Sequence, residues 1–447
     1  MLAGSFHLRM RSNILVHLRP VLGAAVLIAG QIRAQTPTQV APPRAAAPAI
    51  VGKNEGRMLS DEWLAGLRAE VRRKHPTVEA ARKRLAAAAA GVRAVRLWDD
   101  AEMGFSLTAG RLSYRRDNGD IGLGIEQRLP RPGLYSAMKT KAEAEQRAQA
   151  AEVMAAEAML GMETSKAALE LALADEALAL EVQQVEWVKQ MAANAREKTK
   201  DPMTGTAEAL RVESELAQER QKFSAMLRER EQRARQLNIL LGRPAAQPWE
   251  NLSLPGIASA PELKTLLARL SSANPRLQSL RHLASAADAE IVATRRERLP
   301  SVMLSVETMT YSRGDFVDAI FGVKVSLPWF NSRVYRANEE RAAALAGAAQ
   351  RDLAAAEREL QSQAIAASTE ARNAAQQADA FAKEIIPAAS KAAEAVNNAW
   401  LSSKATLLEV LEARRSLLAV RLEERRFIAA HRAALETLRA LVPQDKR

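Results

Sequence analysis

The sequence predicts a mainly α-helical protein with a small β part, arranged as two tandem repeats. The first observation is a run from Gly133 to about Lys198 that is rich in strong helix formers and contains no proline. The second is a pair of short segments with alternating apolar residues before this run, and a similar pair before a later helical run. The third is a set of landmarks that recur about 200 residues apart, which indicates an internal duplication.

The composition favours packed helices and gives no sign of a nucleic-acid partner. Of the 447 residues, 48% are hydrophobic but only 4% are aromatic, which suits close helix packing through small side chains. The net charge is +12, yet lysine and arginine alternate with glutamate along the predicted helices. That pattern is typical of a solvated helix surface, whereas nucleic-acid binding needs a clustered basic face with stacking aromatics.

No combination of residues predicts catalysis or a cofactor. The sequence has no cysteine, which excludes disulfides, thiolate metal sites, a cysteine nucleophile and an acylated lipoprotein cysteine. Its five histidines are scattered, and no pair has the spacing of metal ligands. A hydrolase within the helical body is the alternative, but no nucleophile–base set or phosphate loop is visible. The chain is therefore not expected to be an enzyme.

The N-terminal segment has the pattern of a secretory signal. Residues 1–34 combine a basic stretch, the apolar run Val21–Ala29 and a plausible cleavage site at Ile32-Arg33-Ala34. The apolar run is too short to span a bilayer, which disfavours the alternative of an uncleaved anchor. Residues 35–58 are rich in proline and alanine and are expected to form a disordered arm.

The first repeat is expected over residues 59–242. It opens with a short amphipathic helix, Leu59–Arg73, capped by Ser60, and a second helix that starts at His75-Pro76. Two alternating segments follow, each of about nine or ten residues, the length of a tilted transmembrane strand. They predict a β-hairpin with its turn at Arg115–Gly119, although an ordinary soluble hairpin has the same pattern. The long helix, a turn and a returning helix complete the repeat.

The second repeat is expected over residues 263–443, after a linker at 243–262 and before a short tail at 444–447. It has the same order of elements, including a second hairpin. Its long helix, Ser332–Leu401, contains Pro387, which predicts a kink. The matched landmarks are His75-Pro76 with Asn274-Pro275, Leu129-Pro130 with Leu327-Pro328, and Thr206 with Thr406.

The length of the helices and the number of strands together predict a trimer. A helix from Gly133 to Lys198 would be about 100 Å long, so it must bury its apolar side chains against other long helices. Four strands cannot close a barrel alone, but three copies would supply twelve strands and leave no open edge. We therefore expect a homotrimer with a twelve-stranded transmembrane β-barrel that continues into a long α-helical barrel.

This arrangement resembles the TolC-like outer-membrane efflux proteins over nearly the whole mature chain. The resemblance implies a homotrimer in the lipid of the outer membrane of a Gram-negative bacterium, with a long helical tunnel in the periplasm. It also implies that a periplasmic adaptor and an inner-membrane pump dock at the far tip. The residues that carry it are the His-Pro and Asn-Pro helix starts, the Leu-Pro junctions, the Gly205-Thr206 turn and the segment Ala405–Ala413.

The resemblance leaves the cargo open. The junctions Leu327–Asn331 and Gln127–Gly133 are most similar to the heavy-metal efflux branch. Export of drugs, or of proteins by a type I secretion system, remains an alternative. A periplasmic coiled-coil adaptor or scaffold without a barrel is another, and it would be soluble after removal of the signal. The paired hairpins favour the efflux channel, because a scaffold does not require them.

The resemblance places a pore gate just after the second helical turn. Glu409 and Glu412 share a helix face and would repeat as carboxylate rings in a trimer, which draw cations to a constriction. The alternative is that both are solvated surface carboxylates. Trp400 corresponds to an aromatic residue that would pack across the closed gate. The family often has a basic residue at the position that Ala405 occupies in this chain. Although Lys404 is adjacent, the change to alanine argues against a gate that is held closed by a salt bridge at this position.

The same resemblance assigns adaptor docking to the two turns at the tip. Glycine in the first turn suits close approach of a backbone. Plain helical turns would look the same, so the assignment rests on the resemblance. The predicted docking residues are Met203, Thr204, Gly205 and Thr206 in the first turn, and Ser403, Lys404, Ala405 and Thr406 in the second.

Overall fold

The computed structural model describes residues 56–107, 121–198, 205–310, 316–402 and 404–443. The predicted signal, nearly all of the predicted arm, the hairpin turn at Arg115–Gly119 and the C-terminal tail lie outside these ranges. The docking residues Met203, Thr204 and Ser403 lie outside them as well.

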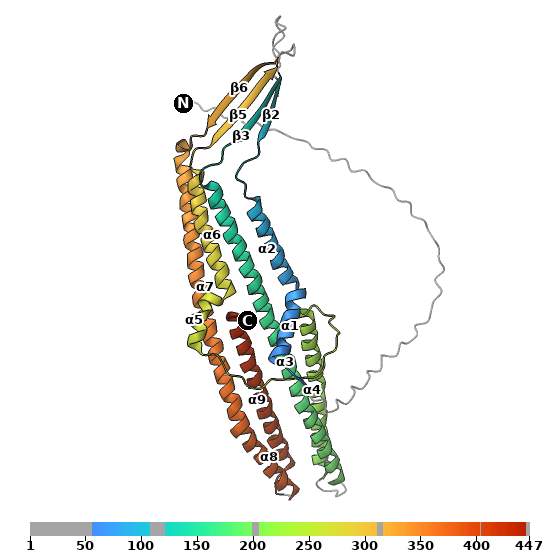
Figure 1. Cartoon of the computed structure of the whole chain (residues 1–447). Helices are drawn as coiled ribbons and strands as arrows, with labels where there is room; N and C mark the ends of the chain where they lie inside the picture. Colours follow the sequence, from blue (N-terminus) through green and yellow to red (C-terminus); the bar gives the residue numbers. More distant parts are fainter. Residues whose placement is uncertain (1–55, 108–120, 199–204, 311–315, 403, 444–447) are drawn as a thin grey trace, which may run out of the picture. The chain divides into compact units, whose positions relative to one another are not determined.

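The described chain is mainly helical, as predicted, and α3 is its longest helix (Figure 1). This helix runs without interruption over 65 residues, Leu134–Lys198, and so matches the predicted long run. Within the described ranges, none of the helices is both long enough and apolar enough to cross a bilayer. The other α-helices are α1 (Asp61–Lys74), α2 (Pro76–Ala94), α4 (Gly205–Leu240), α5 (Leu263–Ala273), α6 (Pro275–Glu297), α7 (Ser332–Ala380), α8 (Ile386–Leu401) and α9 (Leu407–Leu441).

The predicted helix starts are confirmed by their caps. The side chain of His75 accepts a hydrogen bond from the Thr77 N–H, and Pro76 occupies the first turn of α2. Asn274 caps α6 in the same way and is followed by Pro275. Proline has no N–H, and none is needed here because an N–H in the first turn has no acceptor within the helix. The Asn274 amide also donates to the Leu441 carbonyl at 2.9 Å, so the cap of α6 holds the last residue of α9.

The predicted disturbance at Pro387 takes the form of a π-helical turn. The segment η2, Phe381–Ile385, joins α7 to α8, and the Ile386 N–H donates to the Phe381 carbonyl five residues earlier. Proline has no N–H and its ring crowds the carbonyl four residues before it, so the α-helical pattern cannot pass through this point. The predicted second long helix, Ser332–Leu401, is thus composed of α7, η2 and α8.

The strands form one antiparallel sheet in the order β2-β3-β5-β6. The two expected hairpins are present, and they pair through β3 and β5, where Ile125 lies opposite Val306. This central pairing joins the first half of the chain to the second and leaves β2 and β6 as edge strands. The strands are β2 (Glu102–Leu107), β3 (Ile121–Arg128), β5 (Val302–Thr310) and β6 (Phe316–Val325).

The helices next to the sheet are arranged in the same order as the strands. Helix α3 packs against α2 on one side and α6 on the other, and α6 packs against α7. Because α2 leads into β2, β3 into α3, α6 into β5 and β6 into α7, the sheet continues directly into a layer of helices (Figure 1). Farther from the sheet, α3 packs against α4 and α9, while α9 also contacts α7 and α8.

A short parallel pairing lies where no regular structure was expected. Arg57–Met58 (β1) pairs with Leu252–Ser253 (β4), so the last residues of the predicted arm and part of the predicted linker are strands. Leu252 and Leu254 are buried with Leu59 in a core that also includes side chains of α1, α3 and α4. Two-residue strands have no periodicity to detect, and only this tertiary packing fixes them.

Candidate functional site

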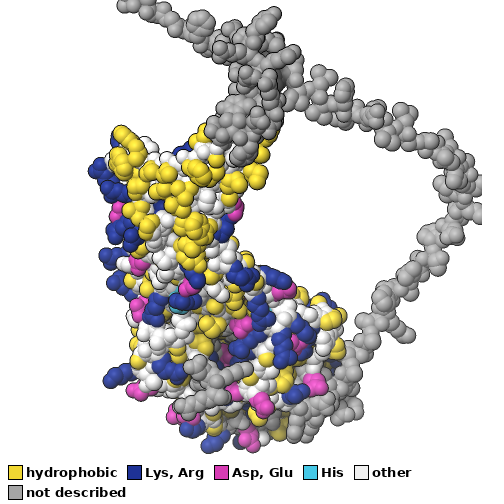
Figure 2. Space-filling view, turned by 45° about the horizontal axis from the view of Figure 1, so that its top comes forward, with side chains coloured by type: hydrophobic (Ala, Val, Ile, Leu, Met, Phe, Trp, Pro, Cys, Tyr) yellow, Lys and Arg dark blue, Asp and Glu magenta, His cyan; other side chains and the backbone are white. Residues whose placement is uncertain are grey.

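The sheet has one apolar face, and that face is exposed. The antiparallel register places alternate residues of all four strands on it, and Phe321 and Phe105 have 79% and 67% of their surface exposed. Figure 2 shows hydrophobic side chains gathered near the sheet, whereas the helical part mixes charged and uncharged side chains. The exposed apolar residues of this face are Met103, Phe105, Leu123, Ile125, Leu304, Val306, Phe321, Val323 and Val325.

The opposite face of the sheet is small and polar. Glu126 of β3 and Lys324 of β6 form an ion pair across it. A Cβ on Gly122 would collide with the Ser106 hydroxyl, and one on Gly322 would collide with the hydroxyl of Ser305. Glycines therefore make room for polar side chains on the neighbouring strands. The sheet is amphipathic, with its apolar side chains turned away from the rest of the chain.

Exposed aromatic residues lie where the sheet meets the helices. Trp98 is in the segment between α2 and β2. Trp329 and Phe330 are in the short 3-10 helix η1, Pro328–Asn331, between β6 and α7. All three side chains have more than half of their surface exposed. Large aromatic rings between an exposed apolar sheet face and the neighbouring helices are typical of a membrane–water interface.

The predicted gate residue Glu409 takes part in a helix cap. Its carboxylate accepts from the Thr406 N–H at 2.8 Å, while its own N–H points to the Thr406 hydroxyl at 3.4 Å. These reciprocal contacts form a capping box at the start of α9. Glu409 and Glu412 are both exposed to solvent in the single chain, so neither is buried by the chain's own packing.

Trp400 lies in an apolar cluster between the two helical hairpins, which we call the tip cluster. Its side chain is 6% exposed. The cluster joins α3 and α4 of the first half to α8 and α9 of the second, so Trp400 holds the two hairpins of one chain together. The buried members are Val188, Met191, Ala192, Ala195, Ala209, Val212, Leu216, Trp400, Leu407, Val410 and Leu411.

The structure describes five of the eight predicted docking residues. Gly205 and Thr206 begin α4. In the second turn Lys404 is exposed, Ala405 is half-buried against the tip cluster, and Thr406 caps α9. The Lys404 N–H donates to the Ala399 carbonyl at 2.8 Å, which fixes the turn after α8.

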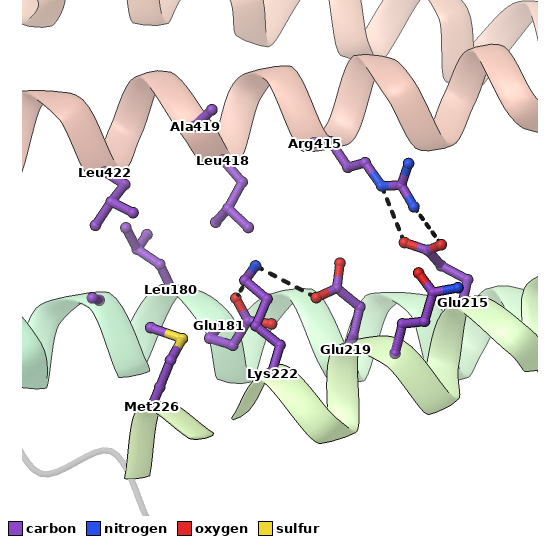
Figure 3. A pocket seen from close by; sticks show the side chains of 12 residues that line it. Leu180, Glu181, Glu215, Glu219, Lys222, Met226, Arg415, Leu418, Ala419 and Leu422 are labelled. Atoms are coloured by element: carbon purple, nitrogen blue, oxygen red, sulfur yellow. Dashed lines mark hydrogen bonds and ion pairs between the residues drawn. The ribbon is translucent and has the colours of Figure 1, made fainter. Parts of the chain in front are cut away.

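A group of ion pairs that no sequence pattern predicted lies beyond the tip cluster, where α3, α4 and α9 meet (Figure 3). Arg415 of α9 binds Glu215 of α4 with both Nε and Nη2, and the Nε–Oε1 distance is 3.1 Å. Lys222 of α4 lies 2.7 Å from Glu181 of α3 and 3.5 Å from Glu219. The first pair could have been found from the predicted duplication, which makes positions 215 and 415 equivalent; these positions carry opposite charges.

Burial changes the electrostatics of this group. It raises the pKa of Glu181 to about 7, helped by a hydrogen bond with Glu219 and opposed by the ammonium of Lys222. Burial lowers the pKa of Lys222, but the contacts with Glu181 and Glu219 outweigh it and raise the pKa overall. Across the described residues, no three His, Asp or Glu side chains are grouped so that they could hold a metal ion.

The fold therefore consists of an amphipathic sheet that continues into a layer of long helices. Residues 266–443 match the model of the outer membrane efflux protein family. The predicted resemblance to the TolC-like proteins is thereby confirmed. The family consists of ducts and not of enzymes. No curated protein sequence matches the chain.

Solved structures of such channels share the fold of the chain. VceC from Vibrio cholerae has a TM-score of 0.72 at 18% identity, covering 86% of this chain and 98% of its own. CusC has a TM-score of 0.71 at 20% identity, and the match covers 88% of this chain and 95% of the CusC chain. The outer-membrane channel MtrE of Neisseria gonorrhoeae, in its open state, has a TM-score of 0.71 at 19% identity, covering 85% and 88%.

Proposed function

We propose that this protein is the outer-membrane exit duct of a tripartite efflux system. The observation that carries the proposal is the apolar sheet face, which is exposed in the single chain and continues into long packed helices. A scaffold in water would leave this face uncovered at a large cost, whereas lipid would cover it. The alternative of a soluble periplasmic scaffold is therefore disfavoured.

The unpaired edges of the sheet and of the helical layer support a homotrimer. Strands β2 and β6 each have one unpaired edge, and α2 and α7 are the matching edges of the helical layer. Three chains joined at these edges would close twelve strands into a barrel and the helices into a tunnel. The apolar face would then meet lipid, and the face with Glu126 and Lys324 would line the lumen.

The helical part belongs in the periplasm under this proposal. The aromatic residues Trp98, Trp329 and Phe330 would sit at the inner surface of the outer membrane, next to the helices. The predicted signal at 1–34 and the repeats at 59–242 and 263–443 fit an exported protein of this design. A periplasmic adaptor and an inner-membrane pump would dock at the opposite end, through the two turns.

The proposed gate combines the carboxylates with a fixed helix start. Because the capping box holds the first turn of α9 rigid, Glu409 would present its charge at a constant height in all three chains. Glu412 follows one turn later on the same face. Trp400 would set the distance between the two hairpins through the tip cluster. Heavy-metal cations are the cargo that the junction sequences favour, and drugs or proteins are the alternatives.

The oligomeric state tests the main proposal. The full chain, extracted from membranes in an uncharged detergent, should elute as a trimer by light scattering and form channels in planar bilayers. A monomer that stays soluble without detergent after signal removal would overturn the proposal in favour of the scaffold.

Channel selectivity tests the gate. The double variant Glu409→Gln, Glu412→Gln should lose most of its preference for cations in single-channel recordings. Glutamine also serves in a capping box, so α9 should keep its start while losing the charge. The matched control is Glu423→Gln, a partly exposed carboxylate farther along α9 that pairs with Arg426. Unchanged cation preference in the double variant would contradict the carboxylate rings.

A further inference from the structure

A cavity of about 480 Å³ lies between α3, α4 and α9, and it has two unlike ends (Figure 3). Leu180, Met226, Leu418 and Leu422 form an apolar end, and the Arg415–Glu215 pair closes the other. Glu181, Glu219 and Lys222 lie between them. This volume is within the range of pockets that hold small organic ligands. The remaining lining residues are Ala177, Gln218 and Ala419.

The charges around the cavity do not balance. Three carboxylates face two cations, and each cation is already engaged: Arg415 by Glu215, and Lys222 by both Glu181 and Glu219. Glu181 is only 2% exposed, and when it is ionised its Oε1 accepts no hydrogen bond from the described residues. A buried carboxylate oxygen without a partner is costly, and an additional cation would remove that cost.

The lining excludes the two simplest ligands. An anion would meet an excess of negative charge. A bare metal ion would need several oxygen or nitrogen ligands around it, but the described residues contain no suitable group of His, Asp or Glu, and most of the cavity surface is hydrocarbon. The combination of a negative centre and an apolar end suits a ligand that has both a charge and a hydrophobic body.

We propose that this cavity is a binding site for organic monocations within the wall of the helical part. The positive centre would lie beside Glu181 and Glu219, and the apolar or aromatic body would lie against Leu180, Met226 and Leu418. The site is separate from the proposed gate at Glu409 and Glu412, and its occupancy does not depend on which cargo the duct carries.

Binding at this site would be linked to a proton. A bound cation favours the ionised form of Glu181. In those molecules in which Glu181 is protonated, the carboxyl group must therefore lose its proton when the ligand binds. The charged groups that face Glu181 are Glu215, Glu219 and Lys222 of α4 and Arg415 of α9. With a pKa of about 7, Glu181 is mostly protonated at pH 6 and mostly ionised at pH 8. Affinity should therefore rise about ten-fold between these pH values.

Calorimetric titration of the full-length protein with tetraphenylphosphonium, in an uncharged detergent, tests the proposal. The wild type should bind about ten times more tightly at pH 8 than at pH 6. Glu181→Gln should weaken binding at pH 8 by about ten-fold and remove the pH dependence. The matched control is Glu186→Gln on the same helix, because Glu186 is exposed and paired only with Lys189 among the described residues.

Two further measurements keep the test decisive. Triphenylphosphine oxide has a similar body without the charge, and it should not bind measurably. Leu418→Gln should weaken tetraphenylphosphonium binding while leaving its pH dependence intact. This variant provides a second test of the site if Glu181→Gln does not assemble. No saturable binding to the wild type, equal binding of the neutral compound, or identical behaviour of Glu181→Gln and Glu186→Gln would each overturn the proposal.

Discussion

Large apolar side chains are exposed on one face of the sheet but are buried at the tip of the helical part. Phe321 in the sheet is 79% exposed, whereas Trp400 at the tip is 6% exposed and packed among residues of four helices. In the sheet, charged residues are confined to one face, while the helices carry ion pairs over much of their surface. Under the proposed function the two regions have different surroundings, with lipid around the sheet and water around the helices.

This difference determines what a charge costs at each place. On the apolar sheet face, the proposed function predicts that a charge is penalised because it would face the hydrocarbon of the lipid. In the helices, a charge is penalised only where other helices bury it, as at Glu181 and Glu215. Substitutions that add or remove charges in the two regions therefore test the comparison directly.

The largest effect is expected in the sheet. Ile125→Lys places an ammonium on the apolar face and should destabilise the assembled protein by about 2–4 kcal/mol, the cost near a bilayer midplane. The yield of trimer in the membrane fraction should fall strongly. Ile320→Lys is the matched control, because Ile320 lies on the polar face opposite Glu307. Equal loss of trimer in the two variants would refute lipid contact on the apolar face.

A smaller effect is expected from breaking the ion pair that joins α4 to α9. Arg415→Gln leaves Glu215 largely buried without its cation, which should lower stability by about 2 kcal/mol. The estimate is below the usual cost for a buried pair because the Arg415 side chain is 48% exposed. Thermal unfolding in detergent measures it. The double variant Glu215→Gln, Arg415→Gln should recover part of the loss, and full additivity would show that the pair does not interact.

The next effect depends on pH and concerns Glu181. Folding raises the pKa of this carboxyl from 4.5 to about 7, so the folded state opposes its ionisation. Stability from this group is therefore complete below pH 4.5 and is lost as pH rises through 7. Glu181→Gln should match the wild type at pH 5 and exceed its stability by about 1–2 kcal/mol at pH 8. A stability difference that is the same at both pH values would contradict the raised pKa.

The smallest effect is expected at the exposed cap of α9. Thr406→Ala removes the hydroxyl of the capping box and should cost about 1 kcal/mol, mostly by loosening the first turn of the helix. Hydrogen exchange of the Glu409 amide should become faster. Ser402→Ala is the control, because that hydroxyl bonds only to carbonyls at the end of α8 among the described contacts. Unchanged exchange at Glu409 would show that the box does not hold the turn.

Local patterns predicted the helices and strands well. The His75-Pro76 and Asn274-Pro275 caps, the unbroken composition of α3 and the alternation in the strands each depend on neighbouring residues, which a sequence displays directly. The capping box at Thr406 and Glu409 was also visible as a threonine followed three residues later by a glutamate. The resemblance assigns Glu409 to the gate, and the structure shows that the same residue caps α9.

Contacts between distant segments could not be predicted in the same way. The pairing of β1 with β4 and the burial of Glu181 depend on how helices and loops pack, which no local pattern encodes. Two ion pairs are partial exceptions. Glu126–Lys324 and Glu215–Arg415 both join positions that the duplication makes equivalent, about 200 residues apart. Opposite charges at equivalent positions of a duplicated chain are thus a usable signal for contacts between the copies.

The pairing of β3 with β5 has a consequence for how the protein reaches its final state. Ile125 and Val306 are neighbours in the sheet but lie about 180 residues apart in the chain, so their contact closes a very long loop. The first hairpin is synthesised well before its partner strand, and its apolar face has nothing to cover it in the meantime. Folding should therefore have a slow, late step in which the two hairpins meet. Until then the exposed apolar face of the first hairpin is a site where chains could aggregate.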